Sequence, residues 1–169
     1  KAENDEELWS WWWYLNDNKE MEGHYVDGRK NGIWTWWFDS GIKQSEGHYV
    51  DDEQDGLWSY FSKDGSVAEE ITFSGGKRDG RSTVWLTPEE KQEEKFYKNG
   101  KLDGPSTFWE NGYRSTMTTY KSDSPEGPWV IWFSNSDQIK EQGFHQKGIR
   151  EGLTTCLLYT SPSPRDDEL

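Results

Sequence analysis

Two residue types recur in this sequence that have the chemistry of a catalytic or metal site, namely histidine and glutamate. The histidines are His24, His48 and His145, and the first two occupy equivalent positions one repeat apart. Two strand spacings of ~4.8 Å would separate them by about 10 Å. Zinc ligands all lie about 2 Å from one ion, so these two cannot share it. We therefore predict no metal site and a structural or solvated role for all three histidines.

Glutamates recur in one column of the sequence, with Met117 interrupting the run: Glu22, Glu46, Glu70, Glu94 and Glu141. Paired carboxylates can perform acid–base chemistry, but neighbours in this column are expected about 10 Å apart. That is beyond the ~6.5–9.5 Å of an inverting glycosidase. A glycosidase also needs one special pair, whereas this column simply repeats. We expect these carboxylates to satisfy a turn or to pair across strands.

No phosphate loop or nucleophilic set is present in the sequence. Gly75-Gly76-Lys77 is the nearest approach to a phosphate loop. Arg78 follows where Ser or Thr is needed, and Ile71 stands where the first Gly belongs. The glycines are instead expected to mark turns. The sequence thus predicts a protein that is not an enzyme, with no catalytic residues and no cofactor.

The charge of the chain restricts its partners. The 169 residues include 32 Asp+Glu and 19 Lys+Arg, a net charge of −13. Nucleic acids and anionic membranes both require clustered Lys and Arg, so neither is an expected partner. No apolar run approaches the ~18 residues of a membrane span. The 12 Trp, 8 Tyr and 7 Phe argue against a disordered chain.

Both ends of the chain look unlike natural termini. The sequence begins at Lys1 in mid-pattern, and residues 156–166, CLLYTSPSPRD, resemble a translated transposase adapter from a sequencing library. The expected organisation is a fragmentary N-terminal segment at 1–6, a repeat domain of about six units at 7–152, and a non-native or disordered tail at 153–169. The cytoplasm is the favoured location, with secretion left open because the N-terminus is missing.

A repeat of about 24 residues organises the chain. Its marker is a glycine preceded by an acid or amide, at spacings of 24, 24, 24, 23 and 25 residues. These glycines are Gly32, Gly56, Gly80, Gly104, Gly127 and Gly152. A turn residue lies four positions before each marker, and an aromatic lies five positions after each of the first five. Recurrence in so many columns indicates a tandem repeat architecture.

Each unit has the pattern of a β-hairpin. Residues 33–38 are aromatic and β-branched, which favours a strand; residues 39–41 supply a turn; and residues 43–50 return. One hairpin is too small to be stable alone, so neighbours must stack. The sequence therefore predicts an all-β fold, an elongated single-layer antiparallel sheet of tandem ~24-residue β-hairpin repeats. Positions two and four after each marker share one face, and position five points to the other.

The repeat pattern of the chain resembles that of a known family, the MORN repeats, and within it the variant branch. The resemblance rests on Gly-x-Trp openings at Gly32 and Gly56, on Glu-Gly-x-Tyr at Glu22 and Glu46, and on the glycine spacing that follows. Ser82 and Ser106 depart from the pattern at the opening Trp position. The resemblance implies stacked hairpins used as interaction scaffolds. Some bacterial members are described as antitoxins of toxin–antitoxin pairs, which implies an antitoxin-like role.

The aromatic column at position five is the candidate binding strip. Its members are Trp13, Trp37, Phe61, Trp85, Trp109 and Trp132. Exposed aromatic strips mark binding surfaces, and an acidic chain steers a basic partner toward itself. The alternative is that the rings only stack within the sheet. Two functions stay open: a protein-binding scaffold with a basic partner, and a secreted binder of carbohydrate or cell wall.

Overall fold

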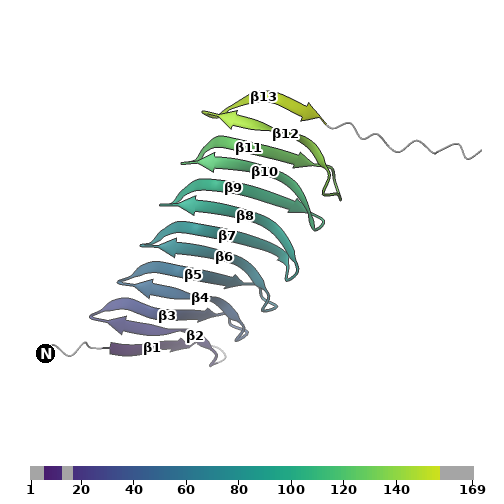
Figure 1. Ribbon diagram of the computed structural model, residues 1–169. Coiled ribbons are helices and arrows are strands. Elements are labelled where there is room, and N and C mark those ends of the chain that lie inside the picture. The colour runs from purple at the N-terminus through teal and green to yellow at the C-terminus, as the bar shows by residue number, and fades with distance from the viewer. Residues whose placement is uncertain (1–5, 13–16, 157–169) are drawn as a thin grey trace, which may run out of the picture.

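The computed structural model describes residues 6–12 and 17–156, and within them the chain forms one open sheet of 13 antiparallel strands without helices. The strands are β1 (Glu6–Trp12), β2 (Lys19–Val26), β3 (Arg29–Trp37), β4 (Lys43–Val50), β5 (Glu53–Phe61), β6 (Val67–Ser74), β7 (Lys77–Thr87), β8 (Glu90–Lys98), β9 (Lys101–Glu110), β10 (Tyr113–Lys121), β11 (Ser124–Trp132), β12 (Ile139–Gln146) and β13 (Ile149–Cys156). Each strand pairs with the next in chain order, and Figure 1 shows the resulting elongated, twisted stack. The predicted all-β repeat sheet is confirmed.

Two-residue turns join each unit to the next. The turn between β2 and β3 is Asp27-Gly28, with φ of 51° and 75° at the two residues, and Asn99-Gly100 between β8 and β9 has 50° and 82°. Positive φ at both central residues defines the type I′ turn, whose twist matches that of antiparallel strands. Asp, Asn and Gly tolerate this conformation best, which explains their recurrence four residues before each marker glycine.

The marker glycines themselves are not turn residues, which corrects the prediction made from the sequence. Gly32 and Gly56 lie inside β3 and β5, each with φ of 72°. The register between β2 and β3 shifts at this point, since Glu22 pairs with Thr35 but His24 pairs with Asn31. The glycine therefore supplies the positive φ of a β-bulge within the strand, a second common use of its conformational freedom.

The connection inside each unit varies. Between β3 and β4, Phe38 N donates to Ile42 O at 2.8 Å, and Gly41 has φ of 83°. Between β7 and β8, Thr87 pairs directly with Glu90, so only Pro88 and Glu89 form the turn. The sequence predicts a different turn here, because Thr87-Pro88-Glu89 replaces the Asp-Ser-Gly pattern. The turn in the structure is indeed different from that between β3 and β4.

The strands extend slightly beyond the expected repeat region. β1 begins at Glu6, and β13 runs to Cys156, where Thr155 pairs with Gln142. Strand pairing thus continues four residues past the expected boundary at residue 152. The rest of the expected tail, residues 157–169, lies outside the described residues.

The most deeply buried rings pack onto glycines of neighbouring strands. Trp34 is 0% exposed and Trp58 is 2% exposed, although the sheet has a single layer. A Cβ added to Gly23 would lie 2.1 Å from the Trp34 indole, and one added to Gly47 would lie 2.1 Å from that of Trp58. The Trp of each of these Gly-x-Trp openings therefore packs on the glycine of the preceding Glu-Gly-x-Tyr pattern. This packing buries a large apolar surface without a second layer.

Units without the opening Trp also lack the glycine. Ser82 and Ser106 occupy the Trp position, and the residues paired with them in the preceding strand are Ile71 and Lys95. Ile71 is 3% exposed and Ser82 is 5% exposed, so the exchanged pair is still packed. A large residue in one strand is thus matched by a small one in its neighbour, and the close packing is kept.

Candidate functional site

The two faces of the sheet carry different sets of aromatic rings. We call the face with the predicted strip the column face; its rings are Trp12, Trp37, Phe61, Trp85, Trp109 and Trp132. We call the other the ladder face; its rings over β1 to β6 are Trp9, Trp11, Tyr25, Trp34, Trp36, Tyr49, Trp58, Tyr60 and Phe73. Side chains alternate along a strand, so successive residues such as Trp36 and Trp37 fall on opposite faces.

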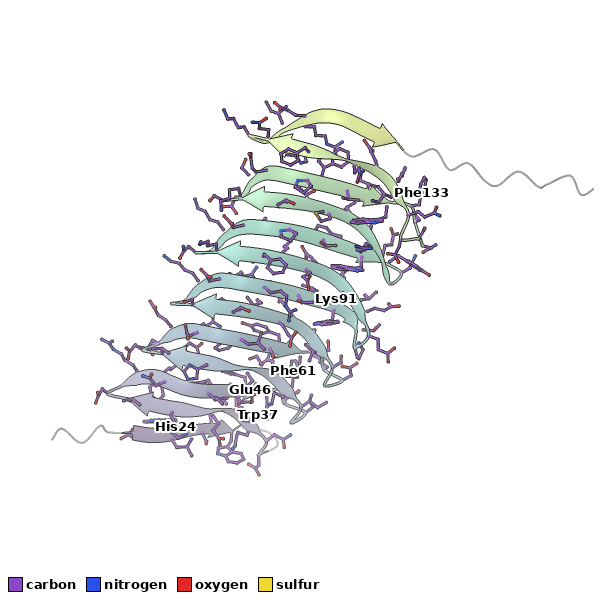
Figure 2. All side chains as sticks on the ribbon, in the orientation of Figure 1. His24, Trp37, Glu46, Phe61, Lys91 and Phe133 are labelled. Carbon is purple, nitrogen blue, oxygen red and sulfur yellow. The ribbon has the colours of Figure 1, made fainter. Side chains whose placement is uncertain are left out.

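The column face alternates rings and cations from strand to strand. Trp12 pairs with Lys19, Trp37 with Lys43, Trp85 with Lys91, and Trp109 with Arg114. Figure 2 shows Trp37, Phe61 and Lys91 following one another along the long axis of the sheet. Phe61 and Trp132 are paired instead with aliphatic residues, Val67 and Ile139.

The cations lie over the ring faces at cation–π distances. Lys91 Nζ is 5.7 Å from the Trp85 ring and 5.6 Å from that of Trp109. Lys19 Nζ lies in the same way between Trp12 and Trp37, at 5.7 and 5.4 Å. Each such contact contributes about 0.5–1 kcal/mol at an exposed site. The column is therefore held together by cations that the chain itself supplies.

The glutamate column anchors these cations. Lys43 Nζ lies 2.7 Å from Glu46, and Thr35 Oγ1 donates to the same carboxylate at 3.0 Å. The hydrogen bond from Lys43 lowers the pKa of Glu46, with a further contribution from Thr35. Glu22 is bonded to Lys19 and to Ser10 in the equivalent way, and its pKa is also lowered. The glutamates thus pair across and along strands.

The predicted strip residues differ in exposure. Trp37, Phe61, Trp85 and Trp109 are half-buried, and Trp132 is buried at 8% exposure beneath Arg114. Trp13 lies outside the described residues, and its neighbour Trp12 is the ring that pairs with Lys19. The structure thus places the described members on one face. Whether they bind a partner stays a prediction.

Sequence reasoning missed the cations of the column face. A signal for them was present, because Lys19, Lys43 and Lys91 each precede a column glutamate by three residues. The i,i+3 spacing would normally place such residues on opposite faces of a strand. The register shift between Trp36 and Trp37 adds one residue to the partner strand and returns Lys43 to the face of Glu46.

The ladder face carries a continuous run of interacting rings over β1 to β6. Tyr25 meets Trp34 edge to face with centroids 5.1 Å apart, and Tyr49 meets Trp58 in the same way at 5.0 Å. Edge-to-face pairs of this kind place the positive edge of one ring on the negative face of another. Sequence reasoning assigned the strand rings to one face but did not identify them as a surface with a function of its own.

The rings of the ladder face over β1 to β6 form three equivalent triads. Each triad consists of two rings from one strand and one ring from the next strand. The first triad is Trp9, Trp11 and Tyr25; the second is Trp34, Trp36 and Tyr49; the third is Trp58, Tyr60 and Phe73. The equivalence follows from the register, since Glu7 pairs with Tyr25, Gly32 with Tyr49, and Gly56 with Phe73.

The ladder face changes character beyond the third triad. Lys95 pairs with the carboxylate of Glu93 and lies 5.4 Å from the Phe108 ring. Arg78 lies 5.4 Å from the Tyr97 ring. Charged residues thus lie among the rings on β7 to β9, and the continuous run of ring contacts that begins at Trp9 ends at Phe73.

Other chemistry is sparse in the part of the chain that the structure describes. His24 and His48 are exposed, whereas His145 is buried with its ring 6.1 Å from that of Trp129. Residues 6–12 and 17–156 contain no group of three or more His, Cys, Asp or Glu side chains placed to hold a metal ion. Across the same residues, no helix has the length and apolarity needed to cross a membrane.

The fold and its packing define a class of protein. Tandem β-hairpins form one open sheet, and the Trp of a Gly-x-Trp opening packs on a glycine of a neighbouring strand. Two stretches of the chain match the model of a known protein family. The model of the MORN repeat variant family matches residues 30–51 and 54–74, which are the second and third hairpins with their turns. Residues 30–51 and 54–74 therefore match the family that the sequence resemblance implies. No curated protein matches the chain.

Proposed function

We propose that this protein is a non-catalytic binding scaffold whose contact surface is the ladder face of β1 to β6, and that its partner is a basic protein. MORN repeats are generally found in scaffolds that bind proteins or membranes. The observation that carries the proposal is the uninterrupted run of rings from Trp9 to Phe73, whose outermost members Trp9 and Trp11 are 43% and 37% exposed. Partly exposed Trp and Tyr rings are the residues that dominate binding energy at protein interfaces.

Charge supports a basic partner. The chain has a net charge of −13, and Glu7 and Asp27 lie beside the first triad. Complementary charge raises the rate of encounter and selects among partners more than it adds affinity. A basic partner would therefore associate quickly at low salt and more slowly as the salt concentration rises.

A matched pair of neighbouring residues tests which face makes the contact. Tyr60 belongs to the ladder face and Phe61 to the column face, and both are half-buried. Proteins captured by the wild-type chain and identified by mass spectrometry should be lost with Tyr60→Ala and kept with Phe61→Ala, at equal melting temperatures of the two variants. Loss with Phe61→Ala alone would assign the contact to the predicted column instead.

A more specific role, that of an antitoxin-like scaffold, is suggested by the family resemblance alone. In such a pair the scaffold neutralises a toxin encoded beside it. Co-expression of the gene with its neighbouring gene gives the test. Growth restored by the wild-type chain and not by Tyr60→Ala would support the role, and a neighbour without toxicity would remove it.

A carbohydrate-binding function is the second candidate, because of one cavity on the ladder face. The cavity, of about 280 Å³, is lined by Trp36 and Tyr60 together with the polar side chains of Gln44 and Ser45. Flat rings with adjacent hydrogen-bonding groups suit a sugar ring. Retention on insoluble glucan or cell-wall material, abolished by Trp36→Ala, would favour this function over protein binding.

A further inference from the structure

The three triads of the ladder face differ in what occupies them. In the second, Lys30 Nζ lies 4.4 Å from the Trp34 ring, 5.4 Å from Trp36 and 5.2 Å from Tyr49. In the third, Gln54 takes the place of Lys30, since it pairs with Tyr49 as Lys30 pairs with Tyr25. Its amide lies 3.5 Å from the Tyr60 hydroxyl. An ammonium group of the chain thus lies over the rings of the second triad, and an amide contacts one ring of the third.

The first triad lines a cavity, and the residue equivalent in register to Lys30, Asp5, lies outside the described residues. A cavity of about 570 Å³ is lined by Trp9, Trp11 and Tyr25 together with the acidic residues Glu7 and Asp27. Within the described residues, no lysine or arginine lies over these three rings, in contrast to the second triad. Trp9 and Trp11 are 43% and 37% exposed, so their faces are accessible from solution.

Two ring pairs of the first triad match those of the second. Trp9 and Tyr25 meet at 81° with centroids 5.9 Å apart, and Trp34 and Tyr49 meet at 83° and 6.2 Å. Trp11 lies 5.5 Å from Trp9, and Trp36 lies 5.7 Å from Trp34. Ring faces arranged in this way attract a cation through their quadrupoles, which is how aromatic cages hold ammonium groups.

The carboxylate of Glu7 distinguishes the first triad from the other two. Glu7 stands in the register position that Gly32 and Gly56 occupy in the later units. It accepts a hydrogen bond from Trp9 Nε1 at 3.0 Å, where Trp34 and Trp58 donate instead to backbone carbonyls. Glu7 thus places a carboxylate beside the rings of the first triad, at a register position where the next two units have glycine.

We propose that the cavity of the first triad binds an alkylammonium group of the kind that a lysine side chain carries. Trp9, Trp11 and Tyr25 would surround the cation, and Glu7 and Asp27 would balance its charge. The inference deepens the proposed function, because it names the chemical group by which a basic partner is held. It does not depend on the identity of that partner, since a free amine supplies the same group.

The test is a titration of the full chain, labelled with ¹⁵N, with n-butylammonium chloride at neutral pH. The indole N–H signals of Trp9 and Trp11 should shift, and the neutral analogue 1-butanol should bind about tenfold more weakly, because it lacks the cation–π and charge contributions. Equal binding of the amine and the alcohol would overturn the proposal, since it would leave only an apolar contact.

Matched variants locate the site. Trp11→Ala should abolish the shifts, whereas Trp12→Ala, on the same strand but on the column face, should leave amine binding unchanged at equal melting temperatures. Glu7→Gln changes charge at nearly constant shape and should weaken the amine several-fold, with a smaller salt dependence than the wild type. Amine binding that survives Trp11→Ala, or falls equally with Trp12→Ala, would refute the assignment.

The source of the ammonium group is resolved by a second titration. N-acetyl-lysine methylamide and its norleucine counterpart differ only in the ammonium, so preferential binding of the lysine compound supports a protein partner as the source. Choline binding with no response to the lysine compound would support a small-molecule source for the same site. If no cation binds in either titration, the inference is refuted. Capture of a basic partner elsewhere on the ladder face would be unaffected by that result.

Discussion

The indole of Trp58 occupies the space that a side chain at residue 47 would need. A Cβ on Gly47 would lie 2.1 Å from the indole, whose Nε1 donates to the carbonyl of His48 at 3.1 Å. Close approach of a ring to the backbone of the neighbouring strand is a recognised reason for glycine within a strand. The contact recurs between Trp34 and Gly23, so it is the packing unit by which successive hairpins are joined.

Substitution of the seating glycine should destabilise the protein. We expect Gly47→Ala to lower the free energy of unfolding by at least about 1–3 kcal/mol, because the added methyl cannot be accommodated without moving the Trp58 ring. Urea denaturation followed by tryptophan fluorescence measures the change. Gly28→Asn is the control: no atom lies within 4 Å of a Cβ there, and Asn tolerates the φ of 75°. A neutral Gly47→Ala would contradict the packing described.

The exchange of large and small residues between strands should be transferable. Gly47→Ile and Trp58→Ser each alone should cost about 3 kcal/mol or more, the first by overpacking and the second by leaving a cavity. The double variant recreates the pair that Ile71 and Ser82 form naturally. We expect it to cost less than the sum of the single variants, with a coupling of about 1–3 kcal/mol in a double-mutant cycle. Additive effects would show that the two positions are independent.

The lysine between two column rings should contribute to stability. Lys91→Met keeps the aliphatic stem but removes the charge that lies over Trp85 and Trp109. We expect a loss of about 1–2 kcal/mol, since two cation–π contacts are removed together. Glu94→Gln serves as the control because it removes only the ion pair with Lys91, which as a surface pair contributes about 0–1 kcal/mol. Equal losses in the two variants would attribute the effect to the ion pair.

Stability should fall in acid in part through Glu46. Its pKa in the folded protein lies below the ordinary value of 4.5, because Lys43 and Thr35 bond to the charged carboxylate. The stabilisation is therefore fully present above pH 4.5 and is lost as the pH falls through the folded pKa. The carboxylate is 39% exposed, so solvent screening limits the contribution to less than about 1 kcal/mol.

A comparison with Glu46→Gln isolates this contribution. The difference in unfolding free energy between wild type and variant should be constant near neutral pH and should shrink below pH 4.5. Chemical denaturation at a series of pH values gives the difference directly. A difference that grows toward low pH would reverse the sign of the proposed linkage.

The sequence by itself determined the period, the strands and the single-layer sheet. Its spacing of glycines, the alternation at Trp34 to Trp37 and the turn pairs such as Asp27-Gly28 are local signals, and local signals suffice because each hairpin contacts only its neighbours. The same alternation placed Trp36 and Trp37 on opposite faces. These features need no knowledge of which residues meet across strands.

Only the tertiary structure decided which side chains lie together. Bulges at Gly32 and at Gln44 shift the register, so counting by two along the sequence does not place Lys43 beside Glu46 or Trp37. The seating of Trp58 on Gly47 and the gathering of Trp9, Trp11 and Tyr25 around one cavity also depend on pairing between strands. A shift of one residue moves every side chain to the other face, and that register is set by three-dimensional packing and bulge position.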